Sequence, residues 1–171
     1  FVTYANIDKF DPRAASDVSF SNELDRWILS ELNQLVARVG KELDSYNPTD
    51  AGRAIGDFVD DLSNWYVRRS RRRFWKSEND ADKMAAHSTL YRSLVTLSKL
   101  LAPFTPFVAE ELYQNLVHPL FPEEPVSVHL AAFPAADPAW TDEQLAQDIH
   151  LAMKVCSLGL AARSKAGIKV R

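Results

Sequence analysis

The chain has 171 residues, 46% of them hydrophobic and 25% charged, and its 20 basic and 23 acidic side chains give a formal net charge of −3. These values are typical of one soluble globular domain and exclude a disordered chain. The single cysteine, Cys156, excludes an internal disulfide framework, and no apolar run approaches the roughly 20 residues of a membrane span. We therefore expect a cytoplasmic protein. Because the sequence lacks an initial Met and stops in what reads as the start of a strand, we also expect a fragment of a longer chain.

Long stretches without proline predict an all-α fold, because a proline inside a helix costs about 3 kcal/mol. Apolar residues that recur every three or four positions predict a first helix over residues 21–43. Ser21 or Asn22 is expected to cap this helix, and Asp25 is a favourable charge in its first turn.

Prolines also mark where the next helices begin and end. Pro48, preceded by Asn47 as the N-cap, is expected to begin a second helix that continues into the 70s. A polar break at residues 77–80 separates it from a third helix, which ends before Pro103. Pro106 is expected to begin a short fourth helix.

The last third of the chain starts with a proline-rich excursion over residues 118–140, in which residues 126–130 predict a short strand. Thr141, with Gln144 three residues later, forms a capping-box pattern that predicts a fifth helix. The predicted fold is an all-α, up-and-down bundle of about five helices, with the excursion and the short strand added to it.

Charge is distributed unevenly along the chain. Residues 1–62 carry a net charge of −6, residues 63–99 of +6, residues 100–153 of −8 and residues 154–171 of +5. The total of −3 argues against a nucleic-acid partner, because phosphate contacts depend on Lys and Arg. The positive charge is, however, concentrated in two segments, so a nucleic-acid partner is not excluded by the total.

The densest basic stretch is residues 68–76, which contain five arginines and a lysine. On a helix, Trp65, Arg68, Arg69 and Arg72 fall on one face. Guanidinium groups bind phosphates with paired hydrogen bonds and stack on bases, and tryptophan offers a further stacking surface. This pattern favours contact with RNA.

Two other interpretations of the same residues stay open. The arginines can form ion pairs with Asp57, Asp60 and Asp61, which lie just upstream, or they can form a solvated face. The aromatic residues Tyr66 and Trp75 can belong to the core or cover a helix end instead of stacking on bases.

The sequence predicts no catalytic site and no metal site. Its four histidines and one cysteine match no zinc-binding spacing, and it has no glycine-rich phosphate loop and no nucleophile motif. The histidines are His87, His118, His129 and His150.

Several segments resemble one protein family. Residues 58–75 closely resemble the anticodon-binding helical domain of class I isoleucyl-tRNA synthetases, and residues 25–30 resemble the entry helix of that domain. Residues 101–113, with their Pro-Phe-x-Pro-Phe and Glu-Glu-Leu-Tyr pieces, are similar to a helix junction found also in valyl and leucyl enzymes. The Asn-Trp-Tyr-Val-Arg-Arg-Ser-Arg-Arg-Arg-Phe-Trp run at residues 64–75 points to the isoleucyl type.

The resemblance implies three parts: a linker from a catalytic core over residues 1–20, the anticodon-binding domain over residues 21–163 and the start of a C-terminal region over residues 164–171. The parent enzyme would use ATP and Mg²⁺ to attach isoleucine to its tRNA. This chain lacks the family's His-Ile-Gly-His and Lys-Met-Ser-Lys-Ser signatures, so it would bind the tRNA without cofactors or catalysis. Its expected partners are the tRNA and the catalytic and editing domains of the same chain, in a monomer without membrane contact.

The predicted tRNA-binding residues lie on the basic stretch and near the C-terminus. They are Trp65, Arg68, Arg69, Arg72, Arg73, Trp75 and Lys76, with Lys165, Lys169 and Arg171 as further expected contacts. The alternatives are the equivalent domain of a valyl- or leucyl-tRNA synthetase, a helical protein-interaction module whose arginines bind an acidic partner, and a structural spacer with paired arginines.

Overall fold

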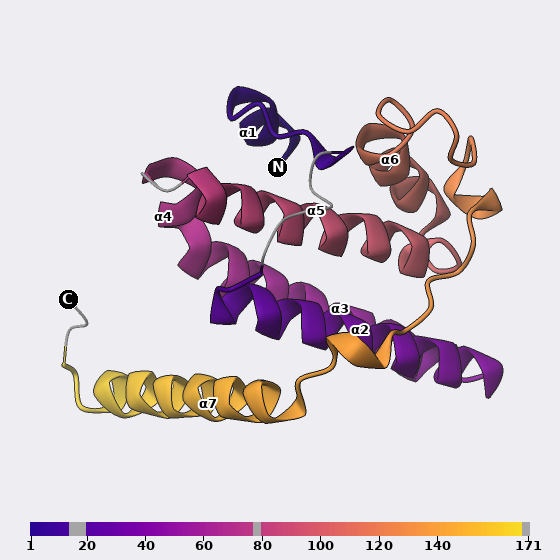
Figure 1. Cartoon of the computed structure of the whole chain (residues 1–171). Coiled ribbons are helices and arrows are strands. Elements are labelled where there is room, and N and C mark those ends of the chain that lie inside the picture. Colours follow the sequence, from indigo (N-terminus) through magenta and orange to yellow (C-terminus); the bar gives the residue numbers. More distant parts are fainter. Residues whose placement is uncertain (14–19, 77–79, 169–171) are drawn as a thin grey trace. The chain divides into compact units, whose positions relative to one another are not determined.

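The computed structural model describes residues 1–13, 20–76 and 80–168, and within these ranges every regular element is a helix (Figure 1). The chain divides into two compact units, Phe1–Thr141 and Asp142–Arg171. The first unit contains α1 (Val2–Ile7), α2 (Glu23–Asp44), α3 (Pro48–Asp61), the π-helical turn η2 (Leu62–Val67), α4 (Arg68–Lys76), α5 (Asp80–Leu101), α6 (Pro106–Leu116) and the 3₁₀ turns η3 (Val128–Leu130) and η4 (Pro138–Trp140). The second unit contains α7 (Glu143–Lys165). The predicted all-α fold is confirmed, and no described helix is both long and apolar enough to cross a bilayer.

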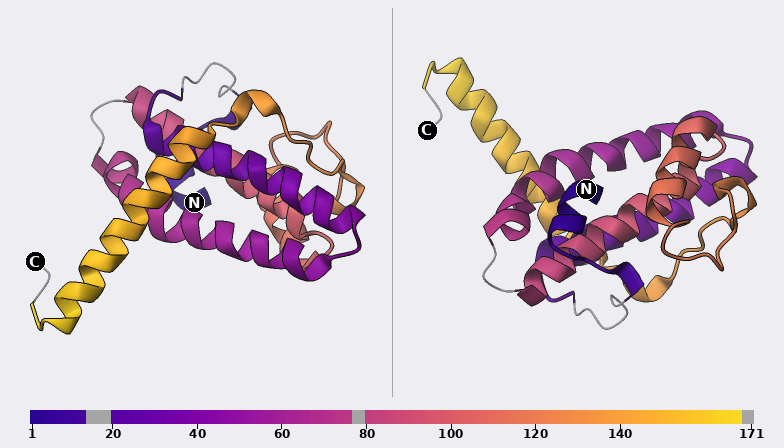
Figure 2. Two further views of the ribbon diagram at one scale, coloured as in Figure 1. Left: turned by 90° about the horizontal axis from the view of Figure 1, so that it is seen from below. Right: turned by 90° about the horizontal axis from the view of Figure 1, so that it is seen from above.

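The core of the first unit lies between α2, α3 and α5, which run side by side (Figure 2). Trp27, Ile28 and Val39 of α2 are completely buried, as is Leu100 of α5, and Phe58 of α3 is 5% exposed. Burial of each such side chain stabilises the fold by roughly 1.5–3 kcal/mol. The apolar stripes predicted for the first two helices therefore form this core.

Helices α2 and α3 each begin directly after a capping asparagine. The side chain of Asn22 accepts a hydrogen bond from the Leu24 N–H at 2.9 Å, so Asn22 rather than Ser21 caps α2. Asn47 caps α3, with Pro48 in the first turn, where its missing N–H leaves no hydrogen bond unmade. The predicted helix from Pro48 into the 70s is confirmed, as the consecutive elements α3, η2 and α4.

The turn η2 changes the phase of this long helix. A π-helical turn is wider than an α-helical one, so the side chains after it point in other directions than a uniform α-helix would give them. Tyr66, inside η2, and Ser70, one turn into α4, are both completely buried. The faces of the arginine-rich helix must therefore be counted from a residue within α4, such as the buried Ser70, and not across η2.

The predicted short strand at residues 126–130 is wrong, because this segment forms the 3₁₀ turn η3. The Glu110 carboxylate on α6 accepts hydrogen bonds from the Ser127 hydroxyl at 2.8 Å and the Val128 N–H at 3.0 Å. The Ser127 hydroxyl oxygen also accepts the His129 N–H at 3.2 Å. These bonds turn the backbone onto α6 and take the N–H groups that a strand would offer to a neighbour.

The predicted capping box at Thr141 is also wrong. Asp142 is the N-cap of α7, and its side chain accepts the Leu145 N–H at 3.1 Å. The Thr141 hydroxyl instead accepts a hydrogen bond from the Asn33 side chain at 2.7 Å. A tertiary contact within the first unit therefore takes the hydroxyl away from the helix that follows it.

The first ten residues pack on α5. Ala5 of α1 is buried, and the rings of Phe1 and Phe10 lie 6.0 and 5.4 Å from the His87 ring on α5. Asp8 binds the Lys83 ammonium and also lies 2.9 Å from the His87 Nε2. The part predicted as a linker is thus held at the bundle by aromatic and ionic contacts. The predicted boundaries at residues 20 and 163 stay predictions.

Candidate nucleic-acid interface

Four arginines of α4 form one exposed face, which we call the basic face: Arg68, Arg69, Arg71 and Arg72. Since an α-helix turns by about 100° per residue, the exposed side chains fall on an arc of about 160°. Their order around the helix is Arg71, Trp75, Arg68, Arg72 and Arg69. Ser70 points the opposite way and is completely buried, which places the basic face on the solvent side.

Two indole rings contact the two outermost arginines of the basic face. The Arg69 guanidinium lies 3.9 Å from the centre of the Trp65 ring, and the Arg71 guanidinium lies 5.3 Å from the centre of the Trp75 ring. Trp75 is 56% exposed, and its ring also lies 5.8 Å from that of Tyr4 in α1. Arginines stacked on indoles in this way keep their N–H groups available for phosphate oxygens.

The basic face carries uncompensated charge. Within the described parts of the chain, no carboxylate forms an ion pair with any of its four arginines. The alternative in which Asp57, Asp60 and Asp61 neutralise the run does not apply to these four residues. An anionic partner could therefore bind these four guanidinium groups without first breaking an ion pair to a carboxylate.

Arg73, which the sequence grouped with the predicted tRNA contacts, lies among carboxylates between helices and not on the basic face. Its guanidinium is 11% exposed and binds both oxygens of Asp25 at 2.7 and 2.6 Å. The Arg73 Nε also donates to the Asp82 carboxylate, at 2.9 Å to its nearer oxygen. Asp25 is completely buried, and its Oδ1 accepts a further hydrogen bond from the Tyr66 hydroxyl at 2.6 Å. Arg73 thus ties α4 to α2 and α5.

The pKa values in this network follow from burial and from the carboxylates. Burial by itself would lower the pKa of Arg73, but its hydrogen bonds to Asp25 and Asp82 raise that pKa above the usual value. Burial, together with the Asp25 charge, raises the pKa of Tyr66. At neutral pH the guanidinium is charged and the phenol is neutral, so each donates to the carboxylate.

A profile of the anticodon-binding domain of tRNA ligases matches residues 25–171 of this chain. The chain belongs to this family. Over its full length it is 67% identical to an isoleucine–tRNA ligase of Dehalococcoides mccartyi, 51% identical to that of Thermus thermophilus and 49% identical to that of Clostridium acetobutylicum. It spans 16–17% of the length of these curated relatives. These similarities favour the isoleucyl type over the valyl and leucyl alternatives.

The other predicted contacts of this anticodon-binding domain lie in the second unit, or have side chains that the structure does not describe. Lys165 lies in the last turn of α7, in the second unit. Lys76 ends α4, but its side chain lies outside the described residues, as do Lys169 and Arg171 entirely. The RNA contacts predicted from the sequence do not include Arg71, because the helical face was counted from Trp65, across the π-helical turn η2. Counting within α4 would have found it, since Arg68, Arg71 and Trp75 are spaced by three and four residues.

The anticodon-binding domain has no evident metal centre in the part that the structure describes, where no three His, Cys, Asp or Glu side chains are grouped to hold an ion. Its nearest approach to a catalytic cluster is Asp8 with Lys83 and His87. Burial lowers the pKa of His87, which Asp8 only partly offsets, so the imidazole is neutral at pH 7. Desolvation would raise the pKa of Asp8, but hydrogen bonds with Lys83 and His87 lower it. This cluster fastens the N-terminal segment to α5.

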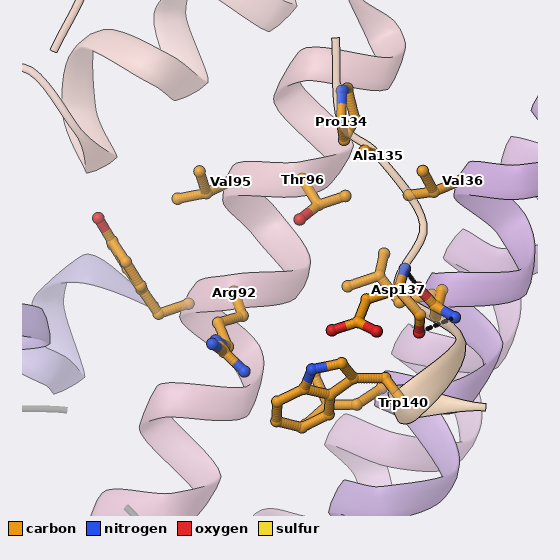
Figure 3. A pocket seen from close by; sticks show the side chains of 12 residues that line it. Val36, Arg92, Val95, Thr96, Pro134, Ala135, Asp137 and Trp140 are labelled. Atoms are coloured by element: carbon orange, nitrogen blue, oxygen red, sulfur yellow. Dashed lines mark hydrogen bonds between the residues drawn. The ribbon is translucent and has the colours of Figure 1, made fainter. Parts of the chain in front are cut away.

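A cavity of about 320 Å³ lies between α2, α5 and the end of the proline-rich excursion (Figure 3). The Arg92 guanidinium lies 4.8 Å from the centre of the Trp140 ring, and the two side chains face each other with Asp137 beside them. The Asn33 side chain donates to the Asp137 carbonyl at 2.9 Å and accepts the Asp137 N–H at 2.8 Å. The polar groups of this cavity thus fasten the excursion to α2.

Proposed function

We propose that this domain binds the anticodon arm of an isoleucine tRNA through the basic face, as part of an isoleucine–tRNA ligase. The observation that carries the proposal is the set of four exposed arginines on one arc of α4, with no carboxylate partner among the described residues. Membership of the anticodon-binding family and the similarity to isoleucine–tRNA ligases support the choice of tRNA as the anion.

The arginines would act on the phosphate backbone, and the indoles on bases. Phosphate contacts fix the position and register of an RNA, whereas unpaired bases of a loop are read by stacking and by their edges. Arg68 and Arg72 lie in the middle of the basic face, one turn apart, and would hold neighbouring phosphates. Trp65 contacts Arg69 and Trp75 contacts Arg71, the outermost arginines of the face, where a loop base can reach the indoles.

The rest of the reaction would belong to other parts of the parent protein. ATP, with Mg²⁺ on its phosphates, would supply the energy for activating isoleucine, and the residues that hold them would belong to other parts of the parent protein. This chain's share is to hold the tRNA without catalysis, beside the catalytic and editing domains of a cytoplasmic, monomeric enzyme. The remaining predicted contacts, Lys76, Lys165, Lys169 and Arg171, would extend the RNA surface.

The test is a salt titration of binding between this chain and the anticodon stem-loop of an isoleucine tRNA. The double variant Arg68→Ala, Arg72→Ala should lower the slope of log K against log salt by roughly 1.5 to 2, because two phosphate contacts are lost. The matched control is Arg38→Ala with Arg53→Ala, which removes two exposed arginines of α2 and α3. An unchanged slope in the first pair, or an equal change in the control pair, would refute the proposal.

The same preparation tests the protein-interaction alternative. Binding to an acidic peptide should be much weaker than binding to the stem-loop at equal salt, because separate carboxylates do not match the spacing of a phosphate backbone. Equal affinity for the peptide and the RNA would favour the protein-interaction module instead.

A further inference from the structure

An aromatic cavity lies at the edge of the basic face. It has a volume of about 260 Å³ and is enclosed by α1, α5 and the η2–α4 segment. Phe1, Tyr4, Val67, Arg71, Phe74, Trp75, His87 and Leu90 line it. Trp75 therefore belongs both to this cavity and to the arc between Arg71 and Arg68.

The walls of the aromatic cavity combine flat rings with one cation. The inner wall is closed by Phe74 and His87, whose ring centres are 5.1 Å apart. The outer rim consists of Tyr4 and Trp75, which are 47% and 56% exposed and whose ring centres are 5.8 Å apart. Among the residues that line the cavity, Arg71 is the one whose side chain is charged at every pH near neutrality. The site is thus apolar within and cationic at its mouth.

The chemistry of these walls fits a nucleobase better than other small groups. A base offers a flat π face that can stack on the rim, where Tyr4 and Trp75 already contact each other. Its phosphate would lie at the mouth, within the field of Arg71 and Arg68. The cavity is smaller than the roughly 300–1,000 Å³ of sites for drug-sized ligands, and this suits a single planar ring system. An acidic peptide would satisfy the arginines but leave the aromatic lining without a partner.

We propose that the aromatic cavity takes one unpaired base of the bound tRNA, stacked against Trp75 and Tyr4, with Arg71 on the adjoining phosphate. This inference rests on the proposed function and adds to it a site that recognises single-stranded RNA. A base inside a duplex cannot enter, because its faces are covered by its neighbours in the stack. The basic face would hold paired or unpaired RNA alike, and the cavity would select the loop.

The test compares two RNAs of equal phosphate number: the anticodon stem-loop of an isoleucine tRNA and a fully paired duplex. Base–aromatic stacking contributes about 1–3 kcal/mol per base, so Trp75→Ala should weaken stem-loop binding by roughly 5- to 150-fold. Its affinity for the duplex and its salt slope should not change, since no phosphate contact is lost. Trp75→Phe should restore most of the stem-loop affinity. The matched control is Trp140→Ala, which removes another partly exposed indole that contacts an arginine.

A second measurement separates stacking from a structural effect of Trp75. The fluorescent base 2-aminopurine is placed in turn at each loop position, and one position should be quenched on binding and recover in Trp75→Ala. Equal weakening of both RNAs, or no quenching at any position, would overturn the cavity proposal. The proposed function would survive that result if Arg68→Ala, Arg72→Ala still lowers the salt slope. Absence of any RNA binding by the unaltered chain would overturn both.

Discussion

Arg72 and Arg73 are neighbours in the chain and lie in opposite environments. Arg72 is exposed, with no ion-pair partner among the described residues, whereas Arg73 is 11% exposed and bonded to Asp25 and Asp82. One residue along an α-helix is a rotation of about 100°, which takes a side chain from solvent to the inter-helix core. The comparison teaches that in a basic run the phase of the helix, not the type of residue, separates the buried, paired arginine from the exposed ones.

The two environments also change how much an arginine contributes to the free energy of unfolding. A buried ion pair has lost its hydration, so removal of one partner leaves a stranded charge. An exposed arginine keeps its hydration and contributes little to folding, which leaves it free to bind phosphate. Variants of the buried network should therefore change stability, and variants of the basic face should change binding.

The largest expected effect is that of Asp25→Ala. This change leaves the Arg73 guanidinium without its main carboxylate and the Tyr66 hydroxyl with only the Ala86 carbonyl at 3.3 Å. It should lower the free energy of unfolding by about 3–5 kcal/mol. Urea denaturation followed by circular dichroism measures it. Arg72→Ala is the control and should stay within about 0.5 kcal/mol of the original chain. A loss below 1 kcal/mol for Asp25→Ala would end the distinction drawn between Arg72 and Arg73.

A smaller loss is expected for Tyr66→Phe, which removes one hydroxyl from the buried network. The bond to a carboxylate at 2.6 Å should be worth roughly 1.5–3 kcal/mol. Tyr91→Phe is the matched control, because its hydroxyl donates to the neutral Leu116 carbonyl at 3.0 Å and should be worth about 0.5–1.5 kcal/mol. Chemical denaturation of the two variants gives the ranking, and a larger loss for Tyr91→Phe would contradict it.

Acid should loosen the other buried ionic cluster, at Asp8 and His87, but not the basic face. Burial holds the pKa of His87 below its ordinary value of about 6.5, so the unfolded chain takes up a proton first as the pH falls. Stability is therefore full above pH 6.5 and declines below it, by about 1.4 kcal/mol per unit of pKa displacement. The lowered pKa of Asp8 adds a further loss below about pH 4.

Thermal unfolding between pH 7 and pH 5 measures this decline. His87→Gln should flatten the dependence on pH, since glutamine does not titrate. His118→Gln, at an exposed histidine, is the control and should leave the dependence as it was. An unchanged pH profile in His87→Gln would show that another group causes the decline.

The smallest expected effect concerns Arg69 on the basic face. Its contact with the Trp65 ring at 3.9 Å should stabilise the fold by only about 0.5–1 kcal/mol, as is usual for exposed pairs of this kind. A double-mutant cycle of Trp65→Ala and Arg69→Ala measures this coupling. The same cycle with Arg68 in place of Arg69 should give no coupling. A coupling above 2 kcal/mol would make Arg69 structural, like Arg73.

The sequence by itself determined what depends on neighbouring residues. Proline positions, the Asn22 and Asn47 caps and the apolar spacing predicted the helices of the bundle, because caps and amphipathic faces act within a few residues. The arginine run and its flanking segments were sufficient to recognise the family, which the match over residues 25–171 confirmed.

Only the tertiary structure decided what depends on distant pairs. Arg73 meets Asp25 from 48 residues away, and Thr141 meets Asn33 from 108 residues away, so neither pairing leaves a local signal. The first pairing buries an arginine that the sequence grouped with the predicted tRNA contacts, and the second accompanies a helix cap one residue later than predicted. The aromatic cavity likewise exists only because α1 packs beside α4, which brings Tyr4 to Trp75. Burial and ion pairing are properties of the packed chain, and they separate Arg73, which connects three helices, from the exposed arginines that we propose bind RNA.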